Sequence, residues 1–118
     1  MSGSPTYVRM YYGYVKAGSE KAVGEILAEF KAEWEKNQIS QPYQVYWNVF
    51  GEEQTCVLVR TAYKDREAWL AEGKEVREKV GEEKLNDLMS RWNKQMRKWE
   101  EHENYPHPDL THIQGEIR

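Results

Sequence analysis

The pattern of hydrophobic and polar positions divides the chain into short strands and amphipathic helices. Residues 6–16 are rich in Tyr and Val and lead into Ala-Gly-Ser, which predicts a strand, a turn and a helix N-cap at Ser19. Over residues 20–37 the apolar side chains recur at positions 23, 26, 27, 30 and 34. This helical spacing predicts an amphipathic helix with one side facing the core.

Two runs of bulky residues follow, at 43–50 and 55–63, separated by a short polar turn that contains Gly51. They predict a β-hairpin. Neither run has a clean polar face, because Tyr, Val and Trp alternate in the first run with Gln, Tyr and Asn. A strand wetted on one side should alternate more sharply, so we expect both faces of this hairpin to be covered.

The second half of the chain is predicted to be mainly helical. Asp65 is a good N-cap for a helix over 66–80, the pattern pauses at Gly81, and a further helix is expected from 82 to about 101. Its apolar positions are spaced 4, 3, 4 and 3, at Leu85, Met89, Trp92, Met96 and Trp99. Such a stripe packs on the chain's own sheet, on a second subunit or along a pocket.

The tail 104–118 contains two prolines, which exclude a helix, and residues 110–113 are expected to form a short edge strand. The order of elements predicts an α+β, ferredoxin-like βαββα(α)β fold with an antiparallel sheet and helices on one face. We expect a single domain over 6–118 after a leader or disordered start at 1–5. The other sheet face is apolar and aromatic, which implies a partner.

Composition narrows the function classes. Hydrophobic residues make up 39% and charged residues 31% of the 118 positions, which predicts a soluble globular protein. A net charge of −3 and a pI near 5.7 give no basic footprint for nucleic acid or an anionic membrane surface. No apolar run approaches the roughly 20 residues that span a bilayer. We therefore expect a cytoplasmic protein, or an extracytoplasmic one if a leader peptide has been removed.

Aromatic and sulfur-containing residues add two further expectations. Five Trp, eight Tyr and two Phe are many rings for a chain of this size, and rings with a polar atom need hydrogen-bond partners when buried. Some of them are expected to line a cavity or a subunit interface. The single cysteine, Cys56, lies in a predicted strand and is interpreted as a small buried hydrophobe rather than a reactive thiol.

Three stretches can be compared with a known family. Residues 14–30, YVKAGSEKAVGEILAEF, form a strand-turn-helix entry; residues 43–50, YQVYWNVF, form a strand; and residues 61–72, TAYKDREAWLAE, form a strand-to-helix junction with Tyr63 where an aromatic residue is usual. Together they cover roughly 7–75, and they resemble the dimeric α/β-barrel superfamily, especially its antibiotic-biosynthesis-monooxygenase-like members.

The resemblance implies a homodimer whose two sheets pack face to face, with helices outside and a small-molecule cavity in each subunit between sheet and helices. It also implies which side of the first strand faces which environment. The helices are expected to meet Arg9, Tyr11, Gly13 and Val15, and the partner subunit to meet Met10, Tyr12 and Tyr14.

The sequence also departs from the family. Members that oxidise quinol-like or polyketide substrates without a cofactor often carry a histidine near the position of Glu72. Haem-degrading relatives use a first-strand Asn where Tyr11 stands here, and polyketide-cyclase relatives use a first-strand His that this chain lacks. Residues 66–101 contain no histidine. None of these activities is therefore transferred to the chain.

Two arginines in predicted strands are candidates for ligand binding. Arg9 and Arg60 are flanked by apolar residues, where an arginine rarely lies without an anionic partner. Either one could bind a substrate carboxylate or enolate. The alternatives are an ion pair with a helix residue such as Glu29, Glu33 or Glu72, or a side chain that reaches water at the sheet edge.

Polar groups on the central strands are the other candidates. Tyr11, Tyr46, Asn48 and Trp47 offer donors that could orient a phenolic ligand in an apolar pocket, although each could equally be a satisfied core or interface group. His112 would lie against the first strand if the tail forms a final strand. The histidines match no metal-ligand spacing, and we expect no metal. The chain has neither a glycine-rich phosphate loop nor a G-x-S-x-G motif.

The leading hypothesis is a homodimer that binds a small aromatic or polyketide-like molecule, with any catalysis being cofactor-free and monooxygenase- or cyclase-like. The residues expected to contact this ligand are Arg9, Tyr11, Tyr46, Asn48, Arg60 and His112. A non-catalytic dimerisation domain is one alternative, and a haem-binding protein with a tail histidine as ligand is another. A further alternative, which the leader-like start at residues 1–5 suggests, is that the chain is an engineered scaffold.

Overall fold

The structure is a computed structural model that describes residues 7–50 and 54–105. Four strands and three helices are present in this part of the chain. In chain order they are β1 (Tyr7–Val15), α1 (Glu20–Lys36), β2 (Gln44–Phe50), β3 (Gln54–Tyr63), α2 (Arg66–Val80), α3 (Glu82–Lys94) and β4 (Met96–Asn104).

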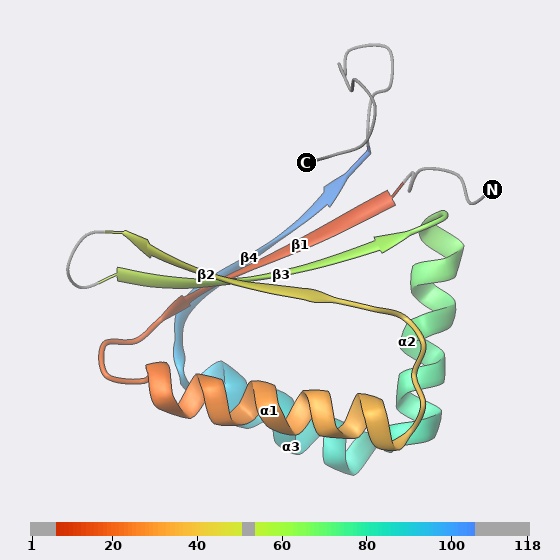
Figure 1. Cartoon of the computed structure of the whole chain (residues 1–118), viewed down its shortest axis with the longest axis horizontal. Coiled ribbons are helices and arrows are strands. Elements are labelled where there is room, and N and C mark those ends of the chain that lie inside the picture. The colour runs from red at the N-terminus through yellow and green to blue at the C-terminus, as the bar shows by residue number, and fades with distance from the viewer. Residues whose placement is uncertain (1–6, 51–53, 106–118) are drawn as a thin grey trace.

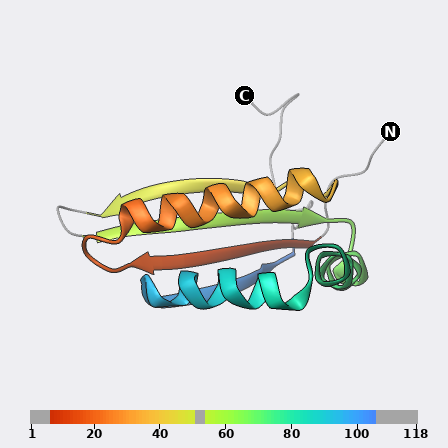
Figure 2. The same cartoon turned by 90° about the horizontal axis from the view of Figure 1, so that it is seen from below.

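The strands form one sheet in the order β2-β3-β1-β4, and all neighbouring strands are antiparallel. The three helices lie on one side of this sheet, as the two views in Figure 1 and Figure 2 show. This arrangement confirms the predicted α+β, ferredoxin-like fold with helices on one face. The sheet is open, with β2 and β4 at its two edges in the described part of the chain.

The last strand corrects the sequence-based prediction for residues 96–101. A helix was expected to continue to about residue 101, but α3 ends at Lys94 and β4 begins at Met96. Residues 96–104 are rich in Lys, Arg and Glu, which favour helices when local propensity alone decides. Their backbone instead pairs with residues 8–15 of β1. Tertiary pairing therefore overrides the local preference.

The edges of β1 are occupied by β3 on one side and β4 on the other. The expected edge strand at 110–113 lies outside the described residues, as does the turn at 51–53.

The helix boundaries follow local signals in the sequence. The Asp65 side chain accepts a hydrogen bond from the Ala68 backbone N–H at 2.8 Å, which confirms Asp65 as the N-cap of α2. Gly81 separates α2 from α3 with a φ of 94°, a conformation that glycine adopts more readily than other residues. Ser19 lies at the N-cap position of α1, but its side chain makes no capping hydrogen bond.

The core lies between the sheet and the helices α1 and α3. It consists of Val15, Val23, Ile26, Val57, Leu88, Trp92 and Met96. The predicted stripe over 85–99 is therefore wrong in detail. Leu88 and Trp92 are the buried positions of α3, Met96 is buried from β4, and Met89 and Trp99 are exposed.

The two faces of β1 are divided as expected. On the helix side, Tyr11 hydrogen-bonds Trp92 of α3 and Arg9 lies over the Trp69 ring of α2. Tyr12 and Tyr14 lie on the opposite side, where they contact side chains of β4.

The register of the β2–β3 pair shows on which face of the sheet each β2 side chain lies, because residues directly opposite one another in an antiparallel pair share a face. Val45 and Trp47 pair with Val59 and Val57, on the helix side. Tyr46 pairs with Leu58, on the outer side. Among the described residues, no helix is both long enough and apolar enough to cross a membrane.

Candidate ligand pocket between the sheet and the helices

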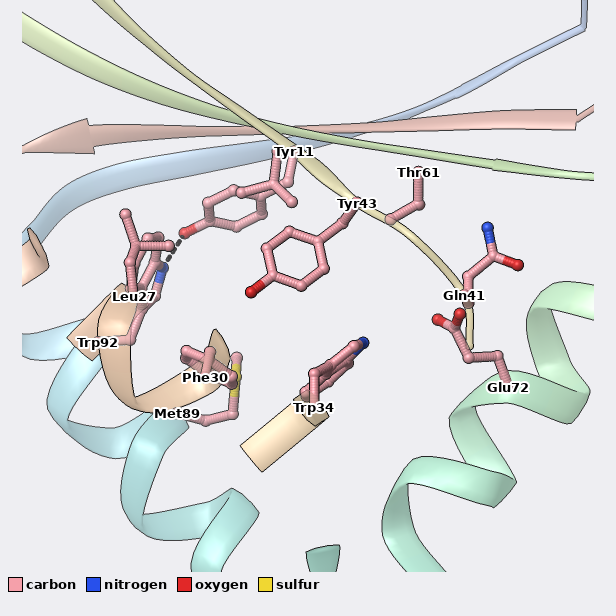
Figure 3. Close-up of a pocket in the computed structure, with 11 residues that line it drawn as sticks. Tyr11, Leu27, Phe30, Trp34, Gln41, Tyr43, Thr61, Glu72, Met89 and Trp92 are labelled. Carbon is pink, nitrogen blue, oxygen red and sulfur yellow. Dashed lines mark hydrogen bonds between the residues drawn. The ribbon is translucent and has the colours of Figure 1, made fainter. Parts of the chain in front are cut away.

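A cavity of about 220 Å³ lies between the helix side of the sheet and all three helices. Figure 3 shows the side chains that surround it. Aromatic and aliphatic groups dominate, with few polar atoms among them. The lining residues are Tyr11, Leu27, Phe30, Trp34, Gln41, Tyr43, Val59, Thr61, Glu72, Met89 and Trp92.

Tyr11 forms the wall of the cavity next to the core. Its hydroxyl accepts a hydrogen bond from Nε1 of Trp92 at 2.6 Å, which fixes the ring orientation (Figure 3). Burial raises the pKa of the Tyr11 hydroxyl. The absence of a side chain at Gly13 makes room for this ring, because a Cβ atom there would lie 2.8 Å from Tyr11 Cε1 and 2.8 Å from Met96 Sδ.

Three further rings form the opposite wall. Phe30 and Trp34 come from successive turns of α1, and Tyr43 precedes β2. The Phe30 and Trp34 rings meet edge to face with centroids 6.2 Å apart, and Trp34 and Tyr43 do the same at 5.8 Å. These edge-to-face contacts hold the rings in defined orientations around the cavity.

Glu72 supplies a carboxyl group to this apolar space. It comes from α2, and the Tyr63 hydroxyl of β3 donates a hydrogen bond to its Oε1 at 2.6 Å. The other oxygen, Oε2, is buried and has no hydrogen-bond partner within the described part of the chain. Burial raises the pKa of Glu72, although the Tyr63 hydrogen bond partly opposes the change. Burial and the neighbouring carboxylate together raise the pKa of Tyr63.

Arg9, a predicted ligand-binding residue, is engaged in an ion-pair cluster beside the cavity. Its Nη1 lies 3.2 Å from Glu103 Oε1, and its Nη2 lies 3.6 Å from Glu101 Oε2. Its guanidinium carbon also lies 3.9 Å from the centre of the Trp69 ring, a cation–π contact. The carboxylate partners thus come from β4 rather than from the helices considered in the sequence analysis.

A smaller hollow of about 160 Å³ adjoins this cluster. It is lined by Arg9, Met10, Tyr11, Val59, Thr61 and Glu101. Arg9 forms ion pairs with Glu101 and Glu103 of β4, so its positive charge is already neutralised within the described part of the chain.

Two further predicted site residues, Arg60 and Tyr46, lie on the outer face of the sheet and do not line the cavity. Arg60 donates a hydrogen bond to Gln44 Oε1 at 3.2 Å on the outer face of the sheet, and the Tyr46 hydroxyl donates to the same oxygen. Asn48 pairs with Cys56 in the β2–β3 ladder. His112 lies outside the described residues. Of the six predicted residues, Tyr11 lines the larger cavity and Arg9 the smaller hollow.

Comparisons with known proteins place the fold. No protein-family model matches the sequence, and no curated protein does. A NIPSNAP family protein from Agrobacterium tumefaciens is similar in structure, with a TM-score of 0.68, 12% identity, and coverage of 94% of this chain and 93% of that one. A protein from Nitrosomonas europaea, provisionally named an antibiotic biosynthesis monooxygenase, is similar with a TM-score of 0.57 and 16% identity, and the match covers 90% of this chain and 95% of that one. A dimeric ferredoxin-like protein from an uncultured marine organism is similar with a TM-score of 0.58 and 11% identity, and the match covers 98% of this chain and 94% of that one.

The chain has the ferredoxin-like fold, which it shares with these solved structures. The resemblance noted in the sequence is thereby confirmed at the level of fold. In the family that the sequence resembles, the cofactor-free oxidising proteins often carry a histidine near the position of Glu72.

Glu72, Trp34 and Tyr43 line the cavity but are not among the site residues predicted from the sequence. A signal for Glu72 was present, because Trp69, Glu72 and Val76 recur at helical spacing and Glu72 thus lies on the inward stripe of α2. An acidic residue on an inward stripe is unusual and indicates a buried role.

The described residues include no group of three or more His, Cys, Asp or Glu side chains placed to hold a metal ion. The described histidine, His102, lies on β4 with its ring edge-on to Tyr12, and the centroids are 5.2 Å apart. This contact belongs to the outer face of the sheet rather than to the cavity.

Proposed function

We propose that the protein is a homodimer in which each subunit binds one small aromatic molecule between its sheet and its helices. The observation that carries this proposal is the apolar cavity of about 220 Å³ walled by Tyr11, Phe30, Trp34, Tyr43 and Trp92. Small-molecule sites are concave and mostly apolar, with a few polar groups that fix orientation. In this cavity those groups are Gln41, Thr61 and Glu72.

The size of the cavity favours a compact ligand. Drug-sized molecules occupy about 300–1,000 Å³, whereas an apolar cavity of about 150 Å³ binds benzene. A cavity of about 220 Å³ lies between these cases. One or two fused rings are thus better matched than the larger polyketide-like molecules considered from the sequence.

The outer sheet face supports the homodimer. Tyr12, Leu58 and Tyr46 lie side by side across β1, β3 and β2, and the Tyr46 side chain is 48% exposed. All three helices cover the other face, so no helix in the described part of the chain covers this row (Figure 1, Figure 2). The similar protein named dimeric and ferredoxin-like adds support for a dimer.

Calorimetric titration with methylnaphthalene, an uncharged two-ring probe, tests the pocket. Met89 and Leu70 form a matched pair, because both are exposed apolar helix residues, at 44% and 49%, and Met89 alone of the two lines the cavity. We expect saturable binding at one site per subunit, its loss in Met89→Trp and its retention in Leu70→Trp. Equal binding by both variants, or no binding by the wild type, would refute the pocket.

Light scattering tests the homodimer independently of the ligand. The wild type should have the mass of two chains, and Leu58→Lys should have the mass of one, because a lysine at the centre of the outer face would bury a charge in the interface. Leu70→Lys, which places the same charge on an exposed helix position, should remain a dimer. A monomeric wild type at micromolar concentration would contradict the proposed assembly.

A further inference from the structure

Among the described residues that line the larger cavity, Glu72 is the one with a charged side chain. Its Oε2 atom is buried without a hydrogen bond in the described part of the chain, and none of the ion pairs between described residues involves Glu72. The Tyr63 hydroxyl satisfies the other oxygen. Burying a carboxylate oxygen in this way costs free energy unless a cation or a further hydrogen-bond donor pairs with it.

The surroundings of this carboxylate are aromatic. Figure 3 shows Glu72 entering the cavity from α2, with Trp34 and Tyr43 between it and Tyr11. Aromatic faces attract cations, and the chain uses this interaction elsewhere, where Arg9 lies over Trp69. Neither Trp34 nor Tyr43 takes part in the cation–π contacts formed by the described residues.

We propose that the cavity binds an organic ammonium ion, with its N–H group donating to Glu72 Oε2 and its apolar body lying against Trp34 and Tyr43. This inference rests on the proposed ligand-binding function and specifies the chemical class of the ligand. An aromatic amine of one or two rings, protonated at neutral pH, has the required size and charge.

Charge complementarity favours this class over other ligands of the same size. An ammonium ion neutralises the buried carboxylate and supplies the missing donor, whereas a neutral hydroxyl supplies the donor and leaves the charge uncompensated. A ligand carboxylate would place a second negative charge beside Glu72 and should be excluded. The described side chains that shift the pKa of Glu72 are Tyr63 of β3 and Glu75 on the same helix, and neither is a cation.

Four probes that share a naphthalene body separate these cases: naphthylmethylamine, naphthol, methylnaphthalene and naphthoic acid. In calorimetric titrations at pH 7 we expect the amine to bind at least about tenfold more tightly than methylnaphthalene, the order expected for a hydrogen bond to a charged group. Naphthol should fall between them, and naphthoic acid should bind most weakly.

The advantage of the amine is the ratio of its affinity to that of methylnaphthalene. Glu72→Gln should abolish this advantage while leaving the affinity for methylnaphthalene unchanged. Glu75→Gln is the matched control, because it removes an acidic group one turn away that pairs with Lys79 at the surface, and it should preserve the advantage. Tyr63→Phe should enlarge the advantage, because it deprives the carboxylate of its present donor. Tyr63→Phe also provides a test with the carboxylate intact if Glu72→Gln fails to fold.

The possible outcomes distinguish this inference from the proposed function. If all four probes bind alike and Glu72→Gln changes nothing, the pocket stands and the ammonium class is refuted. If naphthol binds more tightly than the amine, the ammonium class is also refuted. If no probe binds to the wild type, the proposed function fails and the inference fails with it.

Discussion

Gly13 offers a sharp test of how closely the sheet packs around the cavity. An alanine Cβ at this position would lie 2.8 Å from Tyr11 Cε1, 2.8 Å from Met96 Sδ and 3.1 Å from the Tyr11 hydroxyl oxygen. These separations are shorter than van der Waals contact between such atoms. Met96 is buried and Tyr11 is tied to Trp92, so neither side chain can move away freely.

The expected change in stability of Gly13→Ala is the difference of two effects. Overpacking a core site costs about 1–3 kcal/mol, whereas replacing glycine lowers the entropy of the unfolded chain and stabilises by about 0.4–1 kcal/mol. The net destabilisation should therefore be between about 0 and 2.6 kcal/mol, with a central value of about 1.3 kcal/mol. The shifted Tyr11 ring should also alter the cavity wall and weaken binding of the naphthalene probes.

Urea unfolding at a fixed protein concentration measures this change, since the stability of the proposed dimer would depend on concentration. Gly73→Ala in α2 is the control: an added Cβ there meets nothing within 4 Å, and the substitution should stabilise the helix by about 1 kcal/mol. In a Tyr11→Leu background the cost of Gly13→Ala should fall, because one of the two obstructing groups is gone. A Gly13→Ala variant as stable as Gly73→Ala would refute the packing described for Tyr11.

Three further predictions concern the core, a helix cap and the buried carboxyl. Leu88 is 0% exposed, so Leu88→Ala should lower the free energy of unfolding by about 2–5 kcal/mol, whereas Leu70→Ala at the surface should change it by less than about 0.5 kcal/mol in the same urea assay. Asp65→Ala should cost about 1 kcal/mol through loss of the α2 cap, and Asp65→Asn should retain most of that stability; equal losses would contradict the capping role. The pKa of Glu72 is raised by burial, so its stabilising contribution is fully present below the pKa of the unfolded chain and is lost as pH rises through the folded value. The stability of Glu72→Gln relative to wild type should thus increase from pH 4 to pH 7, and a difference independent of pH would show that Glu72 is solvated.

Much of the framework follows from the sequence because it depends on local signals. The apolar spacing at Val23, Ile26 and Phe30 determines which side of α1 is buried. The polar turn between two runs of β-branched and aromatic residues determines the hairpin, Asp65 starts α2 and Gly81 ends it. Each of these signals acts within a few residues of chain, so it can be recognised without knowledge of the fold.

The tertiary structure alone decided the last strand and the composition of the cavity. Residues 96–104 have a helix-favouring composition and become a strand because β1 offers an unpaired edge, which is distant in the sequence. The cavity brings Glu72 of α2 together with Trp34 of α1 and Tyr43 beside β2, although Glu72 lies 29 positions after Tyr43 and 38 after Trp34 in the sequence. Such contacts depend on how elements pack in three dimensions, so they cannot be predicted from the spacing of residues along a single helix or strand.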